Sequence, residues 1–90
     1  MGVDKTLPDA AAFEAGVRHI WKTAEACGCE LVNIQAGMLH RTLGGYPGRS
    51  HRMPVCCEVM RRLMTGRDRI RSEPAKGKGA SLMITYALPR

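Results

Sequence analysis

The side chains best suited to chemistry are four cysteines and two of the three histidines, and metal binding is the first chemistry they suggest. They are Cys27, Cys29, His40, His51, Cys56 and Cys57. A structural zinc site needs four such donors converging on one ion. The cysteines instead stand as C-x-C and as an adjacent pair, which is not the C-x-x-C spacing of a zinc ribbon. Adjacent residues on a helix also point about 100° apart. A metal- or redox-sensing role, the latter through Cys57, is therefore a minor alternative, and no cofactor is expected.

Catalysis has little support in the sequence. No glycine-rich phosphate loop follows a strand pattern, and the eight acidic residues form no pair suited to acid–base work. His51 and Cys57 make a nucleophile–base pair on paper, but no third residue is evident to orient the base. We therefore do not expect an enzyme.

The distribution of charge is the strongest signal in this chain of 90 residues with a net charge of +6. Residues 1–40 carry three basic and five acidic side chains, whereas residues 41–90 carry eleven basic and three acidic ones. A basic half of this kind is typical of a protein that binds a polyanion. A merely solvated basic surface is the alternative.

Hydrophobic periodicity predicts three helices and a hairpin that would position these charges. The helices are expected at about 8–27, 34–43 and 54–64, and residues 29–33 form a brief strand or lead into the second helix. In the first helix Thr6 is the expected N-cap and Asp9 the third helical residue. The third helix should turn Cys56 inward and leave Cys57 at the margin of its exposed face. One core is expected, made of Phe13, Val17, Ile20, Trp21, Leu39, Leu43, Val55, Val59, Leu63, Ile70, Leu82, Ile84 and Tyr86.

The hairpin is expected at about 68–88. Residues 80–88 alternate apolar and polar, which predicts a strand with one buried face. Arg67, Arg69 and Arg71 are spaced by two, so a strand would place all three on one face. Lys76 and Lys78 lie between glycines in the connecting tip, where they could approach phosphates closely. An edge strand protected from aggregation by its charges is the alternative interpretation.

The order of these elements resembles the winged helix-turn-helix superfamily over about residues 8–88. The resemblance implies one α+β domain over residues 1–90, with three helices and a C-terminal hairpin wing. It also implies that the third helix enters the major groove of double-stranded DNA while the wing contacts the backbone. Glu58 would accept from a cytosine amino group or hold Arg61 or Arg62. The expected contact residues are Arg49, Ser50, His51, Arg52, Cys57, Glu58, Arg61, Arg62, Arg67, Arg69, Arg71, Lys76 and Lys78.

Several alternatives remain at this point. Structured RNA would use the same basic residues, and six methionines offer an adaptable surface to a protein partner. The chain has no apolar run of the roughly 18 residues that cross a bilayer, and no secretion signal, so a soluble cytoplasmic protein with reduced thiols is expected. The role would be that of a regulator or an accessory domain of a DNA-processing system, as a monomer or a homodimer.

Overall fold

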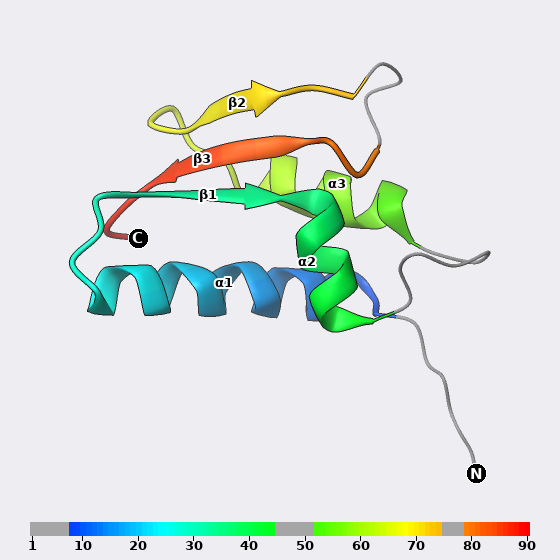
Figure 1. Ribbon diagram of the computed structural model, residues 1–90, viewed down its shortest axis with the longest axis horizontal. Coiled ribbons are helices and arrows are strands. Elements are labelled where there is room, and N and C mark those ends of the chain that lie inside the picture. The colour runs from blue at the N-terminus through cyan, green and yellow to red at the C-terminus, as the bar shows by residue number, and fades with distance from the viewer. Residues whose placement is uncertain (1–7, 45–51, 75–78) are drawn as a thin grey trace, which may run out of the picture.

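The computed structural model describes residues 8–44, 52–74 and 79–90. Its elements follow the order α1 (Ala10–Ala26), β1 (Leu31–Gln35), α2 (Ala36–Leu43), α3 (Met53–Arg62), β2 (Arg69–Ser72) and β3 (Met83–Ala87). The strands form one antiparallel sheet in the order β1-β3-β2. The three helices pack against one another, and α1 and α2 also contact β1 (Figure 1). The α+β class, the three helices and the pairing of the last two strands are thereby confirmed.

Helix α1 begins two residues later than predicted. Asp9 is its N-cap, and the Asp9 carboxylate accepts a hydrogen bond from the Ala12 amide at 2.9 Å. The expected N-cap, Thr6, lies outside the described residues. Phe13, Val17 and Trp21 form the buried stripe, as their spacing predicts. The helix ends at Ala26, and Gly28 follows with φ +82°, a left-handed conformation that glycine adopts without strain.

Strand β1 takes the two residues predicted to begin the second helix. Ile34 pairs with Ile84 and Gln35 with Met83, so the backbone stays extended up to Gln35. Helix α2 then starts at Ala36 without a side-chain cap. Pairing with a distant strand therefore outweighed the local helical composition, which is the usual way in which tertiary structure overrides propensity.

Gly37 allows α2 to approach the segment before β3. Its amide donates to the Ala80 carbonyl at 3.0 Å. A Cβ atom at Gly37 would lie 2.9 Å from the Ala80 Cβ and 3.1 Å from the Ala80 oxygen, which is too close for any other residue without movement. A glycine inside a helix costs about 1 kcal/mol relative to alanine. The close packing of α2 on this segment explains why it is present.

Helix α3 is covered on more sides than one apolar stripe predicts. Cys56 is buried as expected, but Cys57 is also fully buried, so its predicted place on the exposed face is wrong. The segment that leads into β3 covers this side, and the Cys57 thiol donates to the Gly79 carbonyl at 3.4 Å. The Cys56 thiol points toward the Ala36 carbonyl at 3.7 Å, and burial raises its pKa to about 12.

Most of the predicted core is confirmed, with two clear exceptions among the thirteen residues. Leu43 is 36% exposed because it is the last residue of α2, and Ile70 is 39% exposed. Ile70 lies on β2, an edge strand beneath which no described helix packs closely. Ile20, Val55 and Leu63 are half-buried around the core, while the predicted strand face of Leu82, Ile84, Tyr86 and Leu88 is buried throughout.

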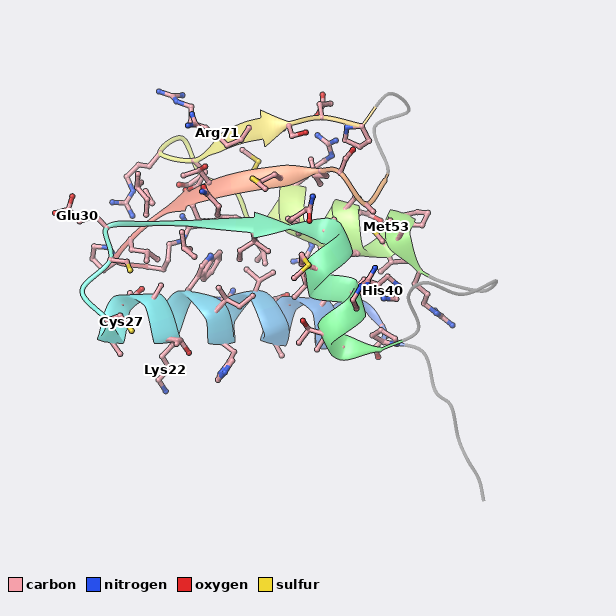
Figure 2. All side chains as sticks on the ribbon, viewed as in Figure 1. Lys22, Cys27, Glu30, His40, Met53 and Arg71 are labelled. Carbon is pink, nitrogen blue, oxygen red and sulfur yellow. The ribbon has the colours of Figure 1, made fainter. Side chains whose placement is uncertain are left out.

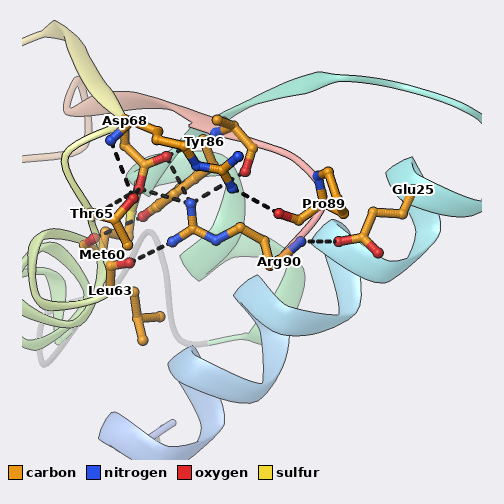
Figure 3. Close-up of polar contacts among 10 residues, drawn as sticks. Glu25, Met60, Leu63, Thr65, Asp68, Tyr86, Pro89 and Arg90 are labelled. Carbon is orange, nitrogen blue, oxygen red and sulfur yellow. Dashed lines mark hydrogen bonds and ion pairs between the residues drawn. The ribbon is translucent and has the colours of Figure 1, made fainter.

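A buried ion pair joins the turn after α3 to the end of β3 (Figure 3). The Asp68 carboxylate accepts hydrogen bonds from the Thr65 amide at 2.7 Å and the Ala87 amide at 2.8 Å. Arg90 donates to both Asp68 oxygens, at 2.8 and 2.9 Å, and to the Leu63 carbonyl at 2.7 Å. This network holds β2, β3 and the end of α3 in one arrangement.

His40 joins the end of α2 to the start of α3. Its ring is fully buried, Nδ1 lies 2.9 Å from the Gly44 carbonyl, and Nε2 accepts from the Arg52 amide at 2.9 Å. These roles require the neutral ring with its proton on Nδ1. The edge-to-face contact with Phe13, at 5.0 Å between ring centroids, ties this junction to α1. His40 is therefore a core residue and not a candidate ligand.

Candidate nucleic-acid interface

The face of the sheet that points away from the helices is the candidate interface. Cross-strand partners point to the same side of an antiparallel sheet, so the register assigns each residue to a face. Asn33, Thr85 and Arg69 form one row across the three strands. The neighbouring row, Ile34, Ile84 and Ile70, belongs to the face that points toward the helices. The polar row therefore lies on the outer face.

A groove of about 370 Å³ runs over this outer face. Arginines from β2 and the turn before it line one side, and residues of β1 line the other, with Thr85 of the central strand between them. Its lining residues are Leu31, Val32, Asn33, Arg67, Arg69, Arg71 and Thr85. The prediction that the three arginines share one face is thereby confirmed, and no acidic side chain lines this groove.

Two of these arginines have free guanidinium groups. Within the described residues, Arg69 and Arg71 form no ion pair and no side-chain hydrogen bond. Arg67 donates to the Pro89 carbonyl at 2.8 Å, a neutral acceptor that leaves its charge uncompensated. A β-bulge between Ile70 and Ser72 interrupts the ladder at Arg71. Such bulges commonly redirect a side chain at a sheet edge.

The two arginines at the end of α3 are held by carboxylates from other elements. Arg61 lies 3.0 Å from Glu73, which follows β2, and Arg62 lies 3.2 Å from Glu14 of α1. The expectation that Glu58 would hold one of them is therefore wrong, although Glu58 itself is exposed as expected. Both pairs are partly exposed, so each adds little to stability. They still reduce the positive charge that α3 offers to a ligand.

The remaining predicted contact residues fall into three groups. Arg52 is exposed and is the N-cap of α3, so it lies at the helix end that would approach a phosphate. Cys57 is fully buried and cannot touch a ligand. Arg49, Ser50, His51, Lys76 and Lys78 lie outside the described residues.

The cysteines do not form a metal site in the described part of the chain. No group of three or more His, Cys, Asp or Glu side chains converges there. Cys27 is exposed, because α1 ends one residue before it. Cys29 is also exposed, whereas Cys56 and Cys57 are buried.

This difference predicts two classes of thiol. In the native protein Cys27 and Cys29 should react with a thiol reagent such as dithiobis-nitrobenzoate within seconds to minutes. Cys56 and Cys57 should react only as fast as the fold opens, because the thiolate is the reactive form and burial disfavours it. Stopped-flow absorbance should count two fast thiols per chain, and four after unfolding in urea. A variant with serine at both positions 27 and 29 should show no fast phase, and a fast phase that persists would contradict the assigned burial.

Sequence reasoning missed four residues of the groove, namely Leu31, Val32, Asn33 and Thr85. The alternation of polar Asn33 and Gln35 with apolar Val32 and Ile34 was a usable signal for a half-exposed strand. Nothing in the local sequence indicates that β1 lies beside β3, more than fifty residues later in the chain. The wall of the groove opposite the arginines thus depends on a non-local pairing.

The fold and the groove define a small α+β protein with a cationic sheet face. Comparison with protein-family models, curated proteins and solved structures finds no match for this chain. None of the helices described is both long and apolar enough to cross a membrane.

Proposed function

We propose that this protein is a winged helix-turn-helix domain that binds double-stranded DNA, with the outer face of the sheet as a principal contact surface. The order α1-β1-α2-α3-β2-β3 and the strand order β1-β3-β2 support the assignment to this superfamily. In that arrangement β2 and β3 form the wing, and α3 is the second helix of the helix-turn-helix pair. The segment between β2 and β3 carries Lys76 and Lys78, which we assign to the wing tip.

The observation that carries the proposal is the group of three arginines in β2 and the turn before it. Arg67, Arg69 and Arg71 line a single groove, none of whose described lining residues carries a carboxylate, and Arg69 and Arg71 have no counter-ion among the described residues. Arginine suits phosphate because its planar donors contact two oxygens at once. Asn33 and Thr85 add neutral polar groups beside the arginines. Three free or nearly free cations at this spacing favour a phosphate backbone as the ligand.

The contribution of α3 to binding is smaller in this proposal than the sequence predicts. Arg61 and Arg62 are paired with carboxylates, and Cys57 is buried. Arg52 and Glu58 remain available, at the start and on the exposed face of the helix. Base-specific contacts would then come from few side chains, whereas backbone contacts come from several. We therefore expect strong salt dependence and modest sequence preference.

The test measures the DNA affinity of variants that lose positive charge. Arg71→Gln and the double variant R69Q/R71Q change the groove, and Lys22→Gln is the control on the opposite side of the molecule (Figure 2). A charged hydrogen bond contributes about 1.5–3 kcal/mol, so the double variant R69Q/R71Q should bind a random DNA duplex about 10- to 100-fold more weakly at low salt. Arg71→Gln alone should account for a measurable part of this loss, and Lys22→Gln should change affinity less than about twofold. Fluorescence anisotropy at several salt concentrations gives both the affinity and its salt slope.

The salt slope supplies the second criterion. Each phosphate contact contributes about 0.9 to the slope of log affinity against log salt, so R69Q/R71Q should lower its magnitude by nearly two. Equal losses in the Arg71 and Lys22 variants would contradict the proposed surface. Tighter binding to an RNA duplex than to a DNA duplex would replace DNA by structured RNA as the ligand. The groove has no aromatic lining residue on which single-stranded bases could stack.

A further inference from the structure

A second cationic site lies away from the sheet groove, in a cleft of about 570 Å³ beside the only tryptophan of the chain. α1 contributes Arg18 and Trp21, the turn after α3 contributes Thr65, Gly66 and Arg67, and the residues after β3 contribute Pro89 and Arg90. Three arginines therefore line one cleft, and none of the described residues that line it is acidic. The sheet groove shares only Arg67 with it.

The cations of the cleft are crowded around one indole ring. The Arg90 guanidinium carbon lies 4.2 Å from the centroid of the Trp21 ring, and that of Arg18 lies 5.6 Å from it. The electron-rich ring attracts each of these cations. An anion in the cleft that both arginines line would be attracted by both.

The protein itself neutralises these charges incompletely. Asp68 compensates Arg90 at 2.8 Å. Arg18 relies on Glu14 at 2.9 Å, but the same carboxylate also serves Arg62 at 3.2 Å. Arg67 has only the neutral Pro89 carbonyl. Glu25 also lies beside Arg90 and accepts from its amide at 2.8 Å. The described residues that line the cleft thus carry three positive charges and no negative one, and Asp68, Glu14 and Glu25 next to it offset part of that charge.

Trp21 provides a second, independent observation at the same place. The residue is 4% exposed, and its indole N–H is buried without a hydrogen-bond partner among the described residues. No other buried side-chain nitrogen or oxygen in the described part of the chain is in this state. A buried donor without an acceptor is unfavourable by about 1–3 kcal/mol. Trp21 lines the cleft, so this unsatisfied donor belongs to the same residue that the arginines surround.

From this cluster we infer an anion site that binds a phosphate dianion, carried either by a free pyrophosphate-type ligand or by the terminal phosphate of a nucleic acid. Arg18 and Arg67 are the recognising residues, and Arg90 is held in place by Asp68 as the inner cation. The site goes beyond the proposed DNA binding: it shares Arg67 with the sheet groove, but Arg69 and Arg71 take no part in it.

Trp21 makes the site directly measurable, since its fluorescence reports the movement of either neighbouring guanidinium group. Titration with sodium pyrophosphate, at ionic strength held constant with sodium chloride, should give a saturable change. Arg18→Gln removes an exposed cation whose helical ion pair adds little to stability, so this variant should fold normally. It should raise the dissociation constant for pyrophosphate at least about tenfold, since one lost charged contact is worth roughly that factor.

Arg71→Gln is the matched control, because it removes the same charge from the sheet groove and leaves the cleft intact. It should change pyrophosphate affinity less than about twofold, and it should weaken duplex binding. Arg18→Gln should instead weaken pyrophosphate binding and change the affinity for an unphosphorylated duplex less than about twofold. Calorimetry provides a second readout of pyrophosphate binding that does not depend on the indole. Absence of saturable binding by both methods, or equal effects of the two substitutions, would overturn the anion site.

The source of the phosphate is settled by oligonucleotide duplexes with and without a 5′-phosphate. Tighter binding of the phosphorylated duplex, lost in Arg18→Gln, supports the site and assigns it to nucleic-acid ends. Equal binding of the two duplexes, together with saturable binding of pyrophosphate, supports the site and assigns it to a free ligand. Failure of duplex binding with retained pyrophosphate binding would reject the proposed function and leave the anion site standing.

Discussion

Replacement of Asp68 by alanine is expected to lower the free energy of unfolding by about 3–5 kcal/mol, the usual effect of removing one partner of a buried ion pair. The Asp68 side chain is fully buried, and it accepts from the Thr65 and Ala87 amides as well as from Arg90. Its loss would leave the Arg90 cation, which is only 11% exposed, without a counter-charge. Urea denaturation followed by Trp21 fluorescence and by circular dichroism would measure the change.

Asp68→Asn removes the negative charge of this side chain and keeps its shape, so it tests the contribution of the charge alone. Burial by itself would raise the pKa of Asp68, but the hydrogen bonds from Ala87 and Thr65 and the contact with Arg90 outweigh it and hold the pKa below the ordinary value of 3.8. A lowered pKa in the folded state means that the carboxylate contributes stability that is fully present above the unfolded pKa. That stability is lost as the pH falls through the lower, folded pKa.

The native protein should therefore exceed Asp68→Asn in free energy of unfolding by the largest amount near neutral pH. This difference should become smaller below about pH 4. Denaturation series at pH 7 and pH 3 give the two differences. An unchanged difference between them would show that the charge of Asp68 does not stabilise the fold. An Asp68→Ala variant as stable as the native protein would contradict the buried network altogether.

Replacement of Phe13 by alanine is expected to cost a comparable 3–5 kcal/mol, because a fully buried phenyl ring is lost and a cavity remains. Phe13 contacts the edge of His40, which in turn holds Gly44 and the Arg52 amide. The cavity would therefore form at the junction of α1, α2 and the start of α3. Against a total stability of about 5–15 kcal/mol for a small domain, such a loss leaves the fold marginal.

Two controls make the Phe13 prediction specific. Phe13→Leu keeps most of the apolar volume and should cost clearly less than the alanine variant. Met38→Ala removes a large apolar side chain that is 59% exposed, and it should change stability by less than about 0.5 kcal/mol. The urea midpoints of the three variants provide the comparison. A Phe13→Ala midpoint equal to that of Met38→Ala would place Phe13 outside the core.

The predictions that held depend on patterns within a few residues. The stripe of Phe13, Val17 and Trp21 marks a helix because only a 3.6-residue repeat brings these side chains to one face. The alternation from Leu82 to Leu88 marks a strand for the corresponding reason. The two-residue spacing of the β2 arginines likewise predicts their common face.

The predictions that failed depended on what covers each element. A helical projection of α3 assigns Cys57 to the margin, but it contains no information about the segment at Gly79 that buries it. Composition predicts a helix from Ile34, whereas pairing with Ile84 keeps that residue in a strand. Gly37 has a low helix propensity, and its role becomes evident only where Ala80 approaches it.

The amino-acid sequence by itself therefore determined the helices, the hairpin, most of the core and the cationic face of β2, because periodicity and charge are local properties of a chain. Tertiary structure alone decided that β1 completes the outer face, that carboxylates engage Arg61 and Arg62, and that three arginines gather around Trp21. Each of these depends on contacts between residues far apart in the chain, and such contacts arise from packing that no local pattern encodes.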